Sequence, residues 1–218
     1  MWGSVIVVGV RSLLGLASRC IRGEWLHLPS SAAGGIESIL FAAFLLLFPV
    51  YLFGLRRGGE AEDFGFVRFP FWRAMRLMAL GWLVWLALEV PWALLMRHFA
   101  ERIQPNMLKV FGGGWRGYLL ALVCGGMIAP FAEETFFRGF LFAGLRQYYP
   151  FWISAGVSGL LFGFIHFMPA ALLPLAAYGV MFAWLRERTG SIWPCIMAHM
   201  LVNSFGFTVA FVVELRAR

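Results

Sequence analysis

The chain is poor in charged residues, and above all in acids. Of its 218 residues 13% are charged and 61% are hydrophobic, and only 11 are Asp or Glu. Soluble domains are nearer one quarter charged and one half apolar, so this composition excludes an ordinary soluble domain and predicts a membrane protein. The net charge of +7 is carried almost wholly by Arg. We attribute it to membrane topology, and we expect no nucleic acid partner.

Cysteine is equally scarce. Cys20, Cys124 and Cys195 lie far apart and form no C-x-x-C pair, which excludes a disulfide framework and a thiolate zinc site. The sequence also lacks an H-E-x-x-H zinc motif and a G-x-S-x-G serine nucleophile. It shows no internal repeat of the kind that many transporters carry.

Long apolar segments are abundant. A membrane core of about 30 Å is crossed by about 20 helical residues, and backbone within lipid has to be helical. We therefore predict an all-α, polytopic membrane helix bundle with six to eight membrane-embedded helices, forming a single domain over residues 1–218. The segment 1–21 is a weaker span, because Arg11 and Arg19 interrupt it. The six stronger predicted spans are residues 36–55, 77–96, 117–132, 151–168, 170–185 and 191–213.

Polar side chains within the apolar segments are concentrated in the second half of the chain. Placing a charge at the bilayer centre costs about 2.5–3.5 kcal/mol on insertion scales, so such residues indicate function. The segment APFAEETFFRGF places Glu133 and Glu134 side by side in an apolar run. His166 and His199 lie in two later apolar segments. Glu89, in an earlier span, is expected to be structural.

Helical spacing gives the two adjacent glutamates different environments. Glu134 lies four residues before Arg138, so the two side chains share a helix face and can form an ion pair. Glu133 is turned by about 100° from Glu134. Pro130 is expected to break or kink the helix, which would place both carboxylates in the first turn of the continuing helix, where the dipole favours anions.

The same spacing recurs in two later segments, where Phe162 precedes His166 and His199 precedes Asn203 by four residues. A carboxylate and an imidazole can activate a water molecule, while a second imidazole and a carboxamide can stabilise an oxyanion. Taken singly, each residue also fits a structural role, such as a packing histidine or an interhelical amide. Their combination predicts hydrolysis by Glu133 and these three polar residues.

Three motifs resemble those of one known family. In this order they match the E-E-x-x-x-R, F-x-x-x-H and H-x-x-x-N motifs of the CAAX-prenyl protease and bacteriocin-processing family, also called CPBP or ABI. The resemblance covers residues 125–206, whereas residues 1–115 are expected to add N-terminal membrane helices. The matching segments are EETFFR with Glu133, Glu134 and Arg138, FGFIH with Phe162 and His166, and HMLVN with His199 and Asn203.

The resemblance implies an α-helical intramembrane endopeptidase. Glu133 and His166 would activate the water, His199 and Asn203 would stabilise the oxyanion, and Glu134, Arg138 and Phe162 would support the site. No cofactor is expected. A divalent metal such as zinc is the mechanistic alternative, with Glu133, His166 and His199 as its ligands.

The expected partners are the lipid bilayer and a peptide or protein substrate at the membrane. The resemblance allows a CAAX-like tail, a bacteriocin leader or a sorting tail as substrate. Together with the preference for Arg over Lys, it predicts an integral protein of a bacterial inner membrane. Two other functions stay open, namely a non-catalytic membrane immunity or scaffold protein and, as the weaker alternative, a small transporter.

Overall fold

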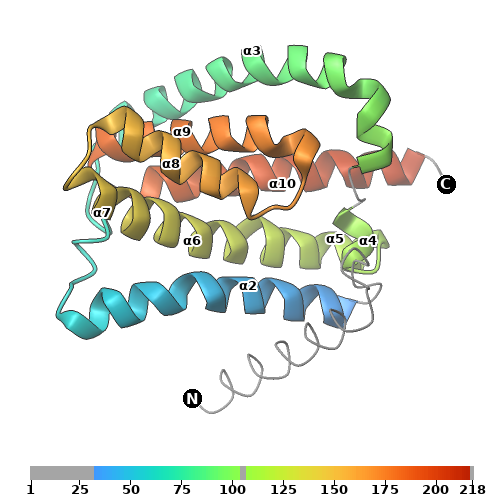
Figure 1. Ribbon diagram of the computed structural model, residues 1–218. Helices are drawn as coiled ribbons and strands as arrows, with labels where there is room; N and C mark the ends of the chain where they lie inside the picture. Colours follow the sequence, from blue (N-terminus) through green and yellow to red (C-terminus); the bar gives the residue numbers. More distant parts are fainter. Residues whose placement is uncertain (1–31, 104–106, 217–218) are drawn as a thin grey trace. The chain divides into compact units, whose positions relative to one another are not determined.

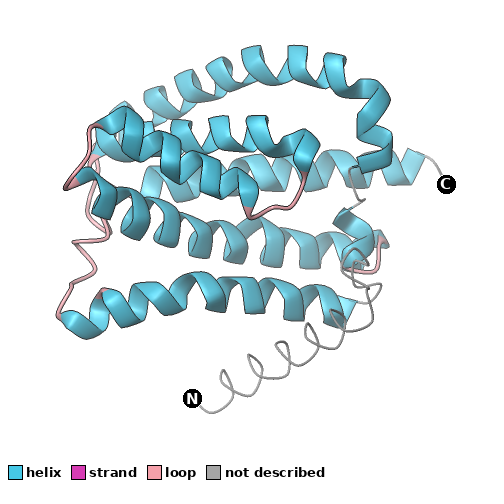
Figure 2. Ribbon diagram, in the orientation of Figure 1, coloured by secondary structure: helices cyan, strands magenta, loops and turns pink. Residues whose placement is uncertain are grey.

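The chain folds into helices joined by turns and loops, as the computed structural model shows for residues 32–103 and 107–216 (Figures 1 and 2). These residues contain no β-strand, which confirms the all-α class. The long helices are α2 (Ala32–Phe53), α3 (Phe71–Ile103), α8 (Phe151–Phe164), α9 (Leu172–Thr189) and α10 (Trp193–Arg216). Short helices are η1 (Leu55–Arg57), α4 (Met107–Val110) and η4 (Pro169–Ala171).

A further long helix runs without interruption from Gly114 to Arg146. It changes its hydrogen-bonding pattern along its length, because two eight-residue π-helical stretches alternate with α-helix. Its consecutive parts are α5 (Gly114–Leu120), η2 (Ala121–Ile128), α6 (Ala129–Glu134), η3 (Thr135–Phe142) and α7 (Ala143–Arg146). π-Helical turns are rare and are found frequently at functional sites.

Within the described residues, four helices are long and apolar enough to cross a membrane. They are Ala32–Arg57, Phe71–Trp92, Gly114–Arg146 and Trp193–Arg216. The other two predicted spans correspond to α8, a shorter apolar helix of 14 residues, and to α9, whose last turn carries Arg186, Glu187 and Arg188. The predicted weak span at residues 1–21 lies outside the described residues.

The described residues group into two compact units. Of the described residues, unit 1 comprises 32–48, 107–132 and 199–216, and unit 2 comprises 49–103 and 133–198. We describe each unit by itself. The single membrane domain expected from the sequence stays a prediction.

Unit 1 is held together by a hydrophobic core between its helices. The ring of Phe211 on α10 stacks on that of Tyr118 of α5 with centroids 4.5 Å apart. The ring of Trp115 meets the Phe211 ring edge-on, with centroids 4.7 Å apart. The Tyr118 hydroxyl lies 2.9 Å from the Thr208 hydroxyl, one turn before Phe211 on α10. The buried core residues are Leu108, Val110, Phe111, Ala121, Cys124 and Phe211.

In unit 2, helix α9 packs closely against α8 through small residues. Gly159 and Gly163 are spaced by four on α8, so they lie on one face of the helix. A Cβ atom added to Gly159 would lie 2.7 Å from the Ala176 carbonyl oxygen, and one added to Gly163 would lie 2.7 Å from the Leu172 carbonyl oxygen. Small residues at this spacing let membrane helices approach backbone to backbone.

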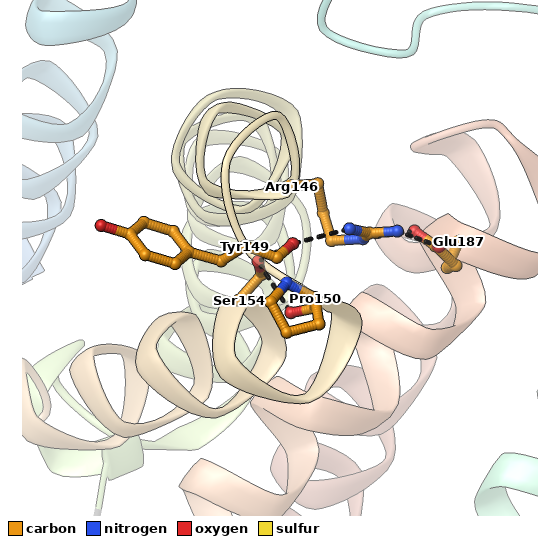
Figure 3. Close-up of polar contacts among 5 residues, drawn as sticks. All are labelled: Arg146, Tyr149, Pro150, Ser154 and Glu187. Atoms are coloured by element: carbon orange, nitrogen blue, oxygen red, sulfur yellow. Dashed lines mark hydrogen bonds and ion pairs between the residues drawn. The ribbon is translucent and has the colours of Figure 1, made fainter.

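A polar clamp joins the ends of three elements in unit 2 (Figure 3). Arg146 of α7 donates two hydrogen bonds to Glu187 of α9, from Nη2 at 2.9 Å and from Nε at 3.2 Å. Its Nη1 donates to the Tyr149 carbonyl at 2.7 Å, and Ser154 of α8 donates to the same carbonyl. The side-chain hydrogen bond from Arg146 holds the pKa of Glu187 below its ordinary value.

Candidate active site

The adjacent glutamates are the last residue pair of α6 and the next residue begins η3. The break predicted at Pro130 is absent, because the helix continues from Gly114 to Arg146, whereas the predicted kink stays a prediction. The carboxylates of Glu133 and Glu134 therefore lie within a helix and gain nothing from a helix N-terminus. The π-helical stretch η2 before Pro130 gives the physical reason, since it changes the hydrogen-bond register where the proline enters.

In this π-helical register, Pro130 leaves one carbonyl without a backbone donor. The Ala129 N–H donates to the Cys124 carbonyl, five residues back. The next bond of that pattern would run from residue 130 to the Gly125 carbonyl, and proline has no N–H. Instead, Nδ2 of Asn203 on α10 donates to the Gly125 carbonyl at 2.9 Å. Within unit 1, Asn203 therefore replaces the backbone donor that Pro130 removes.

The contact between η2 and α10 requires glycine. A Cβ atom added to Gly125 would lie 2.6 Å from Cζ of Phe207, and one added to Gly126 would lie 2.9 Å from the Ser204 hydroxyl oxygen. This close approach brings the Asn203 amide within reach of the Gly125 carbonyl. His199, one turn earlier on α10, is 5% exposed.

The ion pair predicted from sequence spacing is confirmed. Nη1 of Arg138 lies 3.1 Å from Oε1 of Glu134, and both side chains are fully buried. Removing either charge would leave the other without its counterion in a low-dielectric environment, which is strongly destabilising. The pair thus accounts for one of the two adjacent acids.

Aromatic rings surround the Arg138 guanidinium. Its Cζ lies 4.5 Å from the ring centroid of Phe162, 5.1 Å from that of Phe182 and 5.6 Å from that of Phe137. Among the described residues, Nε and Nη2 of Arg138 have no hydrogen-bond partner. Cation–π attraction, which strengthens when the cation is desolvated, stabilises the charge where hydrogen bonds do not. We call Phe137, Phe162 and Phe182 the aromatic cage.

The cage connects the ion pair to the motif histidine. The rings of Phe162 and His166 have centroids 4.9 Å apart. His166 lies two residues after the end of α8 at Phe164, in a turn and not within a helix as the predicted span 151–168 implied. The following residue, Phe167, has a φ of +52°, which is uncommon for a bulky residue. Such strained positions cluster at functional sites.

One hydrogen bond fixes the tautomer of His166. Its Nδ1 lies 2.7 Å from the Phe162 carbonyl oxygen. Because a carbonyl oxygen only accepts, Nδ1 carries the proton and donates it. In the neutral ring Nε2 then holds the lone pair, so Nε2 is the nitrogen that can accept a proton or bind a water.

The seven motif positions divide between the two units. Unit 2 contains Glu133, Glu134, Arg138, Phe162 and His166, and unit 1 contains His199 and Asn203. Their convergence on one catalytic centre stays a prediction.

The metal-dependent alternative has no support within either unit. The described residues of each unit include no group of three His, Cys, Asp or Glu side chains arranged to hold a metal ion. The three residues named as alternative ligands, Glu133, His166 and His199, are distributed over both units. Independence from metal is therefore still a prediction.

Sequence reasoning missed two features of the site. The first is the participation of Phe137 and Phe182 in the aromatic cage. In a chain this rich in aromatic residues, nothing in the sequence distinguishes these two phenylalanines from the others. The second is the small-residue face of α8, which the spacing of Ala155, Gly159 and Gly163 could have indicated. That face matters here because α8 carries Phe162 and leads into His166.

Together these observations define an all-helical membrane protein with a buried charge pair, a caged arginine and an oriented histidine in its second half. The model of the Rce1-like family, type II CAAX prenyl endopeptidases, matches residues 115–205. This segment contains all seven motif positions, so the resemblance to that family seen in the sequence is confirmed.

Two curated relatives are similar to parts of this chain. A protein of Bacillus subtilis (strain 168) with the name "Putative membrane peptidase YdiL" is 34% identical over 86 residues, 39% of this chain and 35% of that protein. An "Uncharacterized 24.3 kDa protein" of Escherichia coli is 30% identical over 141 residues, 61% of this chain and 64% of that protein. The matches thus span less than two thirds of either relative. No solved structure shows a significant match.

Proposed function

We propose that this protein is an intramembrane endopeptidase that hydrolyses a peptide bond of a membrane-associated peptide or protein. The oriented imidazole of His166 is the observation that carries the proposal. A histidine whose Nδ1 is bonded to a carbonyl presents a basic Nε2, which is the form needed to bind and polarise water. The match of residues 115–205 to a family of endopeptidases supports the same reaction, hydrolysis of a peptide bond.

In the proposed mechanism, Glu133 and His166 hold one water molecule. Glu133 takes a proton from it, and the resulting hydroxide attacks the carbonyl carbon of the substrate peptide. The tetrahedral oxyanion accepts hydrogen bonds from His199 and Asn203. The proton held by Glu133 then passes to the amide nitrogen, the C–N bond breaks, and an acid and an amine are released.

Asn203 can serve in two ways at once in this scheme. A carboxamide nitrogen carries two N–H groups. One donates to the Gly125 carbonyl, and we assign the other to the oxyanion. The anchored N–H would fix the direction of the second, which is the preorganisation that oxyanion stabilisation requires.

The supporting residues act through the catalytic ones. Glu134 neutralises Arg138, and Arg138 in turn contacts the ring of Phe162. We propose that this arrangement positions Phe162, and through it the His166 imidazole. The site would operate in a bacterial inner membrane without a metal ion.

The test is cleavage by purified protein in proteoliposomes, followed by mass spectrometry. The peptide panel contains a farnesylated CAAX-type peptide, a double-glycine leader peptide and a C-terminal sorting-tail peptide. Wild-type protein is expected to cleave one class, and Glu133→Ala and His166→Ala are expected to lose that activity. Wild-type rates in both variants would contradict the proposal.

Two controls test two of the alternatives that the sequence left open, a metalloprotease and a scaffold or immunity protein. Chelation should leave the cleavage rate unchanged, and loss of activity restored by a single metal would favour the metalloprotease. A Glu133→Ala variant that retains the full cellular phenotype of the wild type would favour a scaffold or immunity function.

A further inference from the structure

Three buried polar atoms of unit 2 gather at the contact between α3 and α9. They are Nε1 of Trp85, Oε2 of Glu89 and the hydroxyl of Tyr178, and none has a hydrogen-bond partner among the residues that the structure describes. The rings of Trp85 and Tyr178 stack with centroids 4.6 Å apart. Tyr178 is only 7% exposed. We call these three residues the polar trio.

Such atoms are uncommon in a folded protein. Nearly all buried polar groups in native structures have a hydrogen-bond partner, and each exception calls for an explanation. Here three exceptions occur together, in α3 and α9, which pack against each other. Glu89 and Trp85 are four residues apart and hence on one face of α3. A shared ligand is the simplest explanation for all three.

The polar trio is connected to the candidate active site through one ring. The ring of Tyr178 stacks on that of Phe182 with centroids 5.6 Å apart. Phe182 belongs to the aromatic cage of Arg138, at 5.1 Å. Phe162, another ring of the cage, contacts His166. All these residues lie in unit 2.

The chemistry of the trio matches that of a peptide group. The Trp85 indole N–H and the Tyr178 hydroxyl can donate to a carbonyl oxygen, while a Glu89 carboxyl oxygen can accept from an N–H. A substrate that is cleaved within the membrane must be extended at the cut, and its backbone groups there cannot remain without partners in lipid. An intramembrane peptidase therefore has to supply those partners itself.

We propose that Trp85, Glu89 and Tyr178 form a substrate subsite that binds a backbone peptide group of the extended substrate. This subsite rests on the proposed peptidase function. It gives the helix α3, which lies outside the segment matched by the family, a role in substrate binding. It also replaces the structural role that the sequence suggested for Glu89.

The test compares Tyr178→Phe with wild type in two assays. The substitution keeps the stacked ring and removes only the hydroxyl. With the panel peptide that the wild type cleaves, KM is expected to rise about fivefold, the size of one hydrogen bond, while kcat stays unchanged. In the substrate-free protein, the unfolding midpoint is expected to stay the same or to rise, because a buried group without a partner is removed. Trp85→Phe, which removes the indole N–H, is likewise expected to raise KM.

Tyr148→Phe is the matched control, since the Tyr148 side chain is 81% exposed and should change neither quantity. A lower unfolding midpoint in Tyr178→Phe would show that the hydroxyl has an internal partner and would overturn the subsite. Wild-type cleavage with an unchanged KM in the variant would overturn the subsite alone. A wild-type protein that cleaves none of the peptides would contradict the proposed function, and the subsite with it.

Discussion

The most specific structural prediction concerns the carbonyl of Gly125. Asn203 donates to it at 2.9 Å, at the position where Pro130 provides no N–H. We expect Asn203→Ala to lower the free energy of unfolding by about 1–1.5 kcal/mol. Interhelical hydrogen bonds in membranes average about 0.6 kcal/mol and reach about 1.7 kcal/mol. We place this bond in the upper part of that range because Gly125 is buried.

Restoring the backbone donor should remove most of that effect. In a Pro130→Ala background, residue 130 has an N–H that can reach the Gly125 carbonyl, so Asn203→Ala should cost about 0.5 kcal/mol or less. The expected coupling energy in the double-mutant cycle is therefore about 1 kcal/mol. The packing lost with the Asn203 side chain is common to both backgrounds and cancels.

The assay is reversible unfolding in mixed detergent micelles, followed by tryptophan fluorescence. Ser204→Ala, one residue further along α10, is the control, and its effect should be the same in both backgrounds. A coupling energy of less than about 0.3 kcal/mol for Pro130 and Asn203 would be simple additivity and would refute the proposed exchange of donors.

Three further predictions concern unit 2 and use the same unfolding assay unless stated. Gly159→Ala should destabilise the fold by about 1–3 kcal/mol, because the new Cβ would meet the Ala176 carbonyl oxygen at 2.7 Å. Gly156→Ala on the same helix should be neutral or stabilising, because no atom lies within 4 Å of its added Cβ. Equal effects of the two substitutions would contradict the close packing. Phe182→Leu should destabilise by about 1–2 kcal/mol through loss of a ring from the aromatic cage, and a neutral result would exclude that role. Glu187→Gln should cost about 0.5–1 kcal/mol at pH 7. Because the pKa of Glu187 is lowered on folding, this cost should decrease in melting curves as the pH falls below the ordinary carboxyl value and vanish below the lowered pKa of the folded state. A cost that persists at still lower pH would contradict this prediction.

Much of the fold was predictable because lipid permits few alternatives. Apolar segments of spanning length in a chain with few charges had to be helices, and each of the four helices long enough to cross a membrane overlaps a predicted span. The segment 170–185, predicted to span, corresponds to α9, which is not among the four long apolar helices because its last turn carries Arg186, Glu187 and Arg188. The segment 151–168 was predicted too long, since α8 ends at Phe164.

Contacts within one helix of the site could be predicted from residue spacing, whereas contacts between helices could not. The Glu134–Arg138 pair follows from a spacing of four within one helix and is confirmed. The donation of Asn203 to Gly125 and the contacts of Arg138 with Phe162 and Phe182 depend on how the helices pack against each other. Residue spacing along one helix carries no information about those contacts. The catalytic roles of Glu133, His166, His199 and Asn203 remain predictions.

The most direct test of the account compares the two adjacent glutamates. In the proposed mechanism Glu133 performs the chemistry, whereas Glu134 stabilises the buried Arg138. Glu133→Gln should lower kcat about 100- to 10,000-fold, the usual contribution of a general base, with a smaller loss of unfolding free energy than Glu134→Gln. Glu134→Gln should instead lose about 3–5 kcal/mol of stability, because it leaves a buried charge uncompensated. Wild-type cleavage by Glu133→Gln, in a preparation whose wild-type protein cleaves the same peptide, would contradict the central claim.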